Sequence, residues 1–192
     1  MSAGLEKLPP GHVGAVVTFL EMRERPAERP SPASTLRLER WATVEPERYR
    51  NLFRRVGGRW LWFSRLAMGD PELLAKTDRV WEVRDAAGGS VGMLELDFRS
   101  EGECLIRFLG LVPELAGHGH GRWLFAETLR LAWAPGVRLV KVHTCTLDHP
   151  AALPAYLRAG FTAAGRAFES FPDPRLCGLL PIDVAPQLPL IG

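Results

Sequence analysis

The sequence has few cysteines, no long apolar run and no dense run of charge. Its three cysteines, Cys104, Cys145 and Cys177, are odd in number and widely spaced, which favours reduced thiols in apolar surroundings over a disulfide framework. No apolar stretch approaches the ~20 residues of a membrane-spanning helix, and no signal-peptide pattern opens the chain. The net charge is only +2, with no concentrated basic run. We therefore expect a cytoplasmic protein with neither a membrane nor a nucleic acid as its partner.

Length and composition indicate a globular chain that forms one domain. With 192 residues, of which 46% are hydrophobic, the chain can bury roughly 70% of its unfolded surface. We expect residues 1–192 to be a single domain, in which residues 1–35 supply an N-terminal strand and a proline-rich connection.

Hydrophobic periodicity divides the rest of the chain into strands and helices. The predicted strands are Val13–Met22, Leu36–Trp41, Val80–Arg84, Val91–Phe98, Glu103–Leu111, Val137–Cys145 and a last one from Phe161 to about Phe168. The predicted helices are Glu47–Val56, Asp70–Lys76, Arg122–Trp133 and a short one that carries Tyr156. The order of these elements predicts an α+β fold with a mixed, mostly antiparallel central sheet flanked by helices.

The most informative segment is a glycine-rich turn between a predicted strand and a predicted helix. Gly117, Gly119 and Gly121 alternate with single residues directly before the helix that begins near Arg122. Glycines leave the backbone uncovered, so successive N–H groups can point into one concavity at the helix N-terminus, which favours a negative ligand. The spacing is neither that of the P-loop nor that of the dinucleotide-binding pattern. We expect a ligand that carries a pyrophosphate.

A second segment indicates which pyrophosphate it is. Residues 111–121 read LVPELAGHGHG, and residues 149–161, after the next helix and strand, read HPAALPAYLRAGF. Together they resemble the acyl-CoA-binding core of the GNAT acyltransferase superfamily, over residues 104–166. The family's usual Arg or Gln before the glycines is Ala116 here, and its usual Asn is His149. The first change leaves the backbone amides in place, and the second keeps a polar group.

The resemblance implies an N-acetyltransferase that moves an acetyl group from acetyl-CoA to a primary amine of a small molecule or protein by direct attack. It implies no metal, and it admits a homodimer. The residues that it assigns to acetyl-CoA are Leu109, Gly110 and Leu111 along the pantetheine arm, with the Leu111 amide as oxyanion donor, Gly117, His118, Gly119, His120, Gly121 and Arg122 around the pyrophosphate, and His149 at the cofactor amide.

Two residues are candidates for proton transfer. Tyr156 matches the family's tyrosine that protonates the departing thiolate, and a phenol with a pKa of ~10 is protonated at neutral pH. Glu95, on the strand Val91–Phe98, is the candidate base for the acceptor amine. The alternatives are an aromatic packing role for Tyr156 and an ion-paired strand position for Glu95.

The surroundings of these residues leave further alternatives open. Residues 60–65 (WLWFSR) line the acceptor pocket in one interpretation and pack as ordinary hydrophobic side chains in the other. His149 is either a cofactor contact or a histidine held by packing at a helix start.

Two other classes of function compete with the transferase. One is a zinc site, because imidazole and thiolate ligands suit zinc and the chain has His118, His120, His143, Cys145 and His149. The other is a catalytically silent CoA-binding or regulatory module on the same fold, since fold alone does not fix function.

Overall fold

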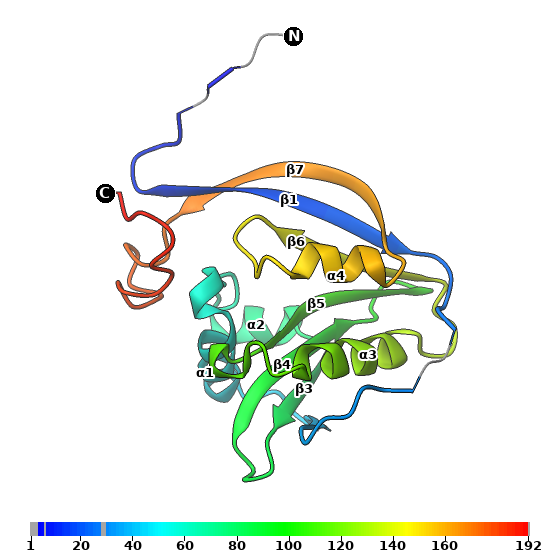
Figure 1. Ribbon diagram of the computed structural model, residues 1–192. Coiled ribbons are helices and arrows are strands. Elements are labelled where there is room, and N and C mark those ends of the chain that lie inside the picture. Colours follow the sequence, from blue (N-terminus) through cyan, green and yellow to red (C-terminus); the bar gives the residue numbers. More distant parts are fainter. Residues whose placement is uncertain (1–3, 6, 28–29, 192) are drawn as a thin grey trace.

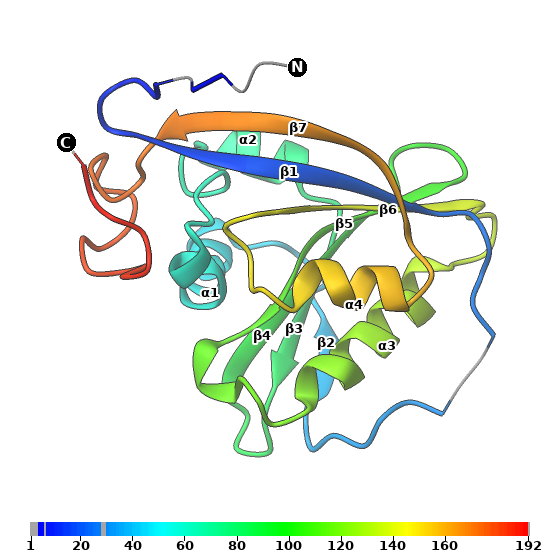
Figure 2. The same cartoon turned by 45° about the horizontal axis from the view of Figure 1, so that its top comes forward.

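The computed structural model describes residues 4–5, 7–27 and 30–191, and its strands form one sheet with helices on both faces (Figures 1 and 2). The seven strands lie in the order β2-β3-β4-β5-β6-β1-β7. Their bounds are β1 His12–Met22, β2 Arg37–Arg40, β3 Arg79–Arg84, β4 Ser90–Asp97, β5 Glu103–Leu111, β6 Leu139–Cys145 and β7 Thr162–Pro172.

The pairing directions explain why the sheet is mixed. β2, β3, β4 and β5 form an antiparallel meander, β5 pairs with β6 in parallel, and β1 lies antiparallel between β6 and β7. The prediction of an α+β fold with a mixed, mostly antiparallel sheet is therefore confirmed. The N-terminal strand is an interior member of this sheet, with a neighbour on each side.

The helices divide between the two faces (Figure 1). The helical bounds are α1 Pro46–Gly57, η1 Gly58–Trp60, α2 Asp70–Lys76, η2 Pro113–Leu115, α3 His120–Ala132 and α4 Ala152–Arg158. Strand alternation distributes the core: Leu94 and Leu96 of β4 pack with the α3 and α4 side chains, whereas Met93 packs with those of α1 and α2. Side chains on one strand therefore reach two separate cores.

Three details differ from the sequence prediction. Helix α3 begins at His120, two residues before the predicted Arg122, because Gly119 has a left-handed backbone (φ 81°) and forms the N-cap. β7 continues to Pro172, since β1 offers it a partner along its whole length. Cys177 is exposed, so the prediction of apolar surroundings was wrong for it, whereas Cys104 is fully buried.

In the part of the chain that the structure describes, no helix is long and apolar enough to span a membrane.

A tight turn after α1 carries Trp62 back towards the sheet. Trp62 N donates to the Gly57 carbonyl at 3.1 Å and Leu61 N to the Gly58 carbonyl at 3.0 Å, which is the hydrogen-bond pattern of a Schellman motif. Leu61 takes the left-handed position (φ 54°), and its side chain is buried. The indole of Trp62 then lies against Gly57, where a Cβ would come within 2.3 Å of the ring.

We predict that Gly57→Ala lowers the free energy of unfolding by about 1–3 kcal/mol, because the added methyl forces the indole of Trp62 out of its place. Gly58→Ala is the matched control: its φ is −55° and its Cβ would meet only Leu180 Cδ2, at 3.8 Å. Urea unfolding of the two variants checks this. Equal stabilities would show that the position of Trp62 does not depend on a glycine at 57.

Candidate functional site

The central feature of the sheet is a gap between β5 and β6. Their parallel pairing runs only from Glu103↔Leu139 to Ile106↔Val142. Beyond that point β5 continues to Leu111 and β6 to Cys145, each without the other as a partner. The two strands therefore diverge and leave backbone groups free inside the sheet.

A β-bulge lies at the point where the strands part. The register between β4 and β5 shifts from Glu95↔Phe108 to Leu96↔Ile106, so Arg107 has no residue opposite it. An extra residue bends its strand and increases the local twist. The side chain of Arg107 is held by Asp97, with Nη2 and Oδ2 3.0 Å apart. Hydrogen bonds from Arg99 and from Arg107 hold the pKa of Asp97 well below its usual range.

The backbone of β5 has one side directed into the gap. Val112 N donates to the Val91 carbonyl at 2.9 Å, and strand alternation directs Gly110 to β4 as well, opposite Met93. The N–H and C=O groups of Leu109 and Leu111 therefore face the gap. Of the three residues predicted along the pantetheine arm, these two present free backbone, and Gly110 does not.

The glycine-rich turn presents a row of free amides at the start of α3. Gly117 and Gly119 both have φ 81°, and the five amides of residues 117–121 have no acceptor among the described residues. A Cβ on Gly117, Gly119 or Gly121 would meet nothing within 4 Å, so the turn is open. Free N–H groups at a helix N-terminus form an anion site.

The histidine side chains of this turn, unlike its backbone amides, already contact other groups of the chain. The ring of His118 lies 3.0 Å from the Ala116 carbonyl, and that of His120 lies 2.9 Å from the hydroxyl of Ser34. The amide of Arg122 is already used, because it donates to the Gly119 carbonyl at 3.1 Å. What Arg122 can offer a ligand is its exposed guanidinium.

A carboxylate that the sequence did not single out joins β6 to the turn after α1. Asp148 Oδ2 accepts hydrogen bonds from the Thr144 hydroxyl and the Cys145 amide, both at 2.9 Å. Its Oδ1 accepts one from Trp62 Nε1 at 3.1 Å. An Asp at the end of a strand is a weak signal by itself, and its partner Trp62 is distant in sequence. Asp148 therefore fixes the end of β6 relative to α1.

Two of the predicted residues lie near this carboxylate. His149 Nδ1 accepts a hydrogen bond from the Ala151 amide at 3.1 Å, and its ring meets Trp60 edge-on at 5.2 Å. Tyr156 is buried against Phe125 and Phe161. Burial, with a smaller contribution from Asp148, raises the pKa of Tyr156 well above 10, so its phenol is protonated.

Glu95 is enclosed on the other face of the sheet. Its side chain has no exposed surface, and its two oxygens accept hydrogen bonds from the Tyr49 hydroxyl and the Arg65 guanidinium. Arg65 is itself buried and donates to the Lys76 carbonyl at 3.0 Å. Burial raises the pKa of Glu95, while Arg65 opposes that rise. These contacts match the ion-paired alternative that the sequence left open.

The aromatic residues of the turn after α1 have separate positions. Trp60 and Trp62 reach the turn after β6, as described, and Phe63 stacks on Phe171 at 4.6 Å. Arg65 points to Glu95. These residues bridge α1 and the far strands, and no single pocket contains all of them.

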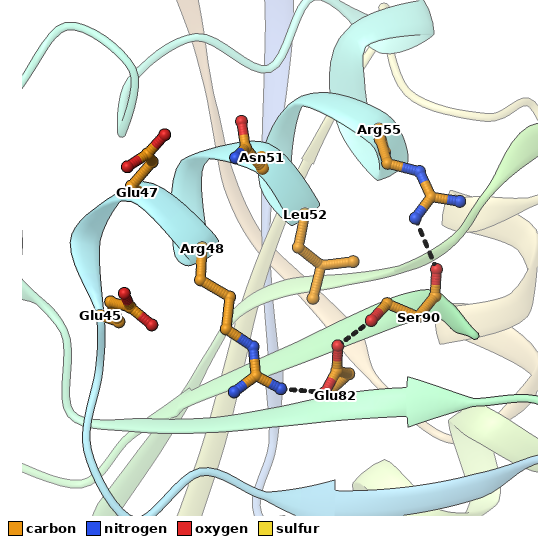
Figure 3. A pocket seen from close by; sticks show the side chains of 8 residues that line it. All are labelled: Glu45, Glu47, Arg48, Asn51, Leu52, Arg55, Glu82 and Ser90. Atoms are coloured by element: carbon orange, nitrogen blue, oxygen red, sulfur yellow. Dashed lines mark hydrogen bonds and ion pairs between the residues drawn. The ribbon is translucent and has the colours of Figure 1, made fainter. Parts of the chain in front are cut away.

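Two surface cavities lie outside the gap. One, of about 340 Å³, contains a chain of contacts in which Arg48 binds Glu82 at 2.5 Å, the Ser90 hydroxyl donates to Glu82, and Arg55 binds the Ser90 carbonyl at 2.9 Å (Figure 3). Glu45 and Glu47 also line this cavity, and it includes none of the predicted site residues. The second, of about 360 Å³, adjoins the end of β5, and its lining includes three guanidinium groups, those of Arg54, Arg55 and Arg59.

The zinc alternative finds no set of ligands. Within the residues that the structure describes, no group of three or more His, Cys, Asp or Glu side chains is placed to hold a metal ion.

Comparison with known proteins agrees with this geometry. The model of the acetyltransferase (GNAT) family matches residues 38–161, and no curated protein matches the chain. Among solved structures, a GCN5-related N-acetyltransferase from Sphaerobacter thermophilus is 20% identical, with a TM-score of 0.56 over 85% of this chain. This chain spans only 52% of that protein.

Two other structures give the same result. An acetyltransferase of the GNAT family from Novosphingobium aromaticivorans is 15% identical, with a TM-score of 0.57 over 87% of this chain and 69% of its own length. AAC(6')-Iy in complex with a bisubstrate analogue of CoA is 18% identical, with a TM-score of 0.51 over 70% of this chain and 95% of its own. These likenesses establish the fold, and the family model establishes the membership. The chain belongs to the GNAT acetyltransferase family, and this membership supports an acyltransferase activity.

Proposed function

We propose that this protein is an N-acetyltransferase that moves an acetyl group from acetyl-CoA to a primary amine of a small molecule or a protein. The observation that carries the proposal is the row of free amides at residues 117–121, next to the free edge of β5. A pyrophosphate joined to an extended amide-bearing arm matches both features: anion donors at the turn and unpaired strand groups beside it. Residues 104–166 are the proposed acetyl-CoA-binding core.

The residues present suit acetyl-CoA. At Gly117, Gly119 and Gly121 no side chain holds a phosphate away from the amides, and the exposed guanidinium of Arg122 adds a positive charge. Along β5, the free N–H and C=O groups of Leu109 and Leu111 can pair with the amides of the pantetheine arm. His118 takes part through its amide, whereas Gly110 and His149 are proposed only as neighbours of these groups.

The chain has a donor for each charge that develops in acyl transfer. Acetyl-CoA, when bound, supplies a thioester whose carbonyl carbon is attacked by the amine. The free amide of Leu111 is the proposed oxyanion donor. Tyr156 is the proposed proton donor to the leaving sulfur, since its phenol is protonated and makes no hydrogen bond to the described residues.

A silent CoA-binding module is the second candidate. The enclosed position of Glu95 favours it, because the predicted base is bound to Arg65 and Tyr49 instead of facing a ligand. A screen of amines, amino acids, polyamines and peptides for CoA release separates the two. Acetyl-CoA binding without turnover across the panel would support the silent module and exclude the transferase.

The acceptor amine, a homodimer and the cytoplasmic location stay predictions.

We predict that Gly121→Glu abolishes acetyl-CoA binding, through its bulk and the repulsion between its carboxylate and the pyrophosphate. Gly121→Ala is the matched control, because a Cβ there meets nothing within 4 Å and the residue is already helical. His118→Ala should bind normally, since the amide and not the ring is the proposed contact. Isothermal titration calorimetry measures all three. Equal affinity of Gly121→Glu and the unsubstituted protein would overturn the cofactor site.

We predict that Tyr156→Phe reduces kcat by a factor of about 10²–10⁴, the range for loss of a general acid. The substitution keeps the ring contacts with Phe125 and Phe161, so stability and acetyl-CoA affinity should change little. Steady-state kinetics together with calorimetry test it. Turnover close to that of the unsubstituted enzyme would make Tyr156 a packing residue and assign the proton to water.

We predict that Glu95→Gln lowers the free energy of unfolding by about 3 kcal/mol, because Arg65 then keeps a buried charge without its counter-charge. Glu103→Gln is the control: Glu103 pairs with Lys141 at the surface, so its loss should cost only about 0–1 kcal/mol. Urea unfolding measures both. A Glu95→Gln variant as stable as the parent, whose kcat/KM is lower at neutral pH and no longer falls as the pH is lowered, would restore Glu95 as the base.

A further inference from the structure

One titratable side chain lies at the apex of the gap and has no role in the function proposed above. His143 follows Val142, the last residue of β6 that pairs with β5. Val140 and Val142 pack into the core beneath α3 and α4, so alternation directs His143 to the opposite face, the face of α1 and α2. β6 lies between β5 and β1 there (Figure 1).

The imidazole of His143 is held in place by packing, but its two ring nitrogens have no hydrogen-bond partner among the described residues. The ring of Phe19 on β1 meets it edge-on, with the centroids 4.6 Å apart. The residue is exposed, and neither ring nitrogen makes a hydrogen bond to the described part of the chain. A ring fixed on one side and open on the other leaves both nitrogens available to a ligand.

The charges around His143 favour its neutral form. One face of the His143 ring is covered, and this partial desolvation, followed by Arg107 on β5 and Lys141 on β6, lowers the pKa of His143 below its usual value. Three carboxylates on this face are paired: Asp97 with Arg107 at 3.0 Å, Glu103 with Lys141 at 2.7 Å, and Glu21 on β1 with Arg23 at 2.7 Å. Glu169 of β7 is on the same face but lies opposite Ala15, four residues along β1 from Phe19. β7 contributes the uncharged Gly165 opposite Phe19. At neutral pH the ring can therefore accept a proton.

The position of His143 also fits the two proton transfers of acyl transfer. Tyr156, the proposed donor, packs in the core under α3 and α4, on the face opposite His143. Because the sheet separates the proton acceptor from the proton donor, Tyr156 cannot pass its proton directly to His143. Glu95 lies on the same face as His143 but is enclosed and bound to Tyr49 and Arg65.

We propose that His143 is the group that accepts the proton of the acceptor ammonium. This inference rests on the proposed function. The ammonium gives one proton to a ring nitrogen of His143, which afterwards releases it to solvent. The resulting amine forms the C–N bond at the thioester carbonyl carbon, and the C–S bond breaks when the oxyanion collapses. The leaving thiolate takes the proton of Tyr156, which solvent replaces, and the amide nitrogen loses its second proton to solvent. The balance is one ammonium and one thioester giving one amide, one thiol and one proton.

The first test is the pH profile of kcat/KM for the parent enzyme and for His143→Gln, with any amine that supports CoA release. The parent should lose activity as the pH falls through the pKa of His143, because the imidazolium cannot accept a proton. His143→Gln should lack this acid limb and be slower by about 10²–10⁴-fold at neutral pH. His12→Gln, a histidine at the far end of β1, should match the parent.

A second variant keeps the imidazole and shifts its pKa. Lys141→Gln removes a cation and frees the Glu103 carboxylate, and both changes favour the imidazolium. The acid limb should therefore move to higher pH, together with the titration of the His143 ring protons followed by NMR. This coupling of a rate and a spectroscopic pKa is not expected of a residue that only packs.

The outcomes separate the inference from the proposed function. CoA release by the parent, with an unchanged pH profile in His143→Gln or an unmoved limb in Lys141→Gln, would overturn the role of His143 and leave the transferase intact. If the parent binds acetyl-CoA but releases no CoA with any amine, the transferase itself fails, and the role of His143 fails with it.

Discussion

The site depends on one constraint: β5 and β6 are paired at one end and separated at the other. A strand that loses its neighbour inside a sheet must satisfy its N–H and C=O groups in some other way. Here the bulge at Arg107 turns β5 away, the pair with Asp97 holds the bulge in place, and Leu109 and Leu111 keep free backbone groups. Unpaired backbone groups of this kind would destabilise an ordinary sheet, and here they are the groups that can pair with a ligand.

The open end of the gap is kept in position from the α1 side. The turn after α1 places the indole of Trp62 against both Phe53 and Phe108, with ring centroids 5.5 and 5.2 Å away, and its N–H donates to Asp148. β5, α1 and the end of β6 are thereby joined through one side chain. A Cβ on residue 57 would come within 2.3 Å of this indole, so the close approach of Trp62 to α1 depends on the small size of Gly57.

The sequence predicted the features that depend on neighbours along the chain. The alternating glycines, the strand before them and the helix after them follow local rules of turn geometry and periodicity, and the structure differs there only by the earlier start of α3. The bulge at Arg107, the insertion of β1 between β6 and β7, and the partners of Asp148 depend on residues that meet only after folding. Glu95 shows the difference most clearly: alternation gave its face, but only packing reveals that Arg65 and Tyr49 occupy its oxygens.

The two faces of the sheet also differ in their electrostatics, so the two sides of the gap are not equivalent. Under α3 and α4 the surroundings of Tyr156 are apolar, so burial keeps its phenol protonated. On the α1 and α2 face, Arg107 and Lys141 lie near His143 and disfavour its cationic form. In the proposed transferase, a proton is therefore available on one face and can be accepted on the other, while the unpaired backbone of β5 lies between them. Tyr156 is positioned by Phe125 and Phe161 and His143 by Phe19, so the separation of the two groups follows from the packing of the sheet itself.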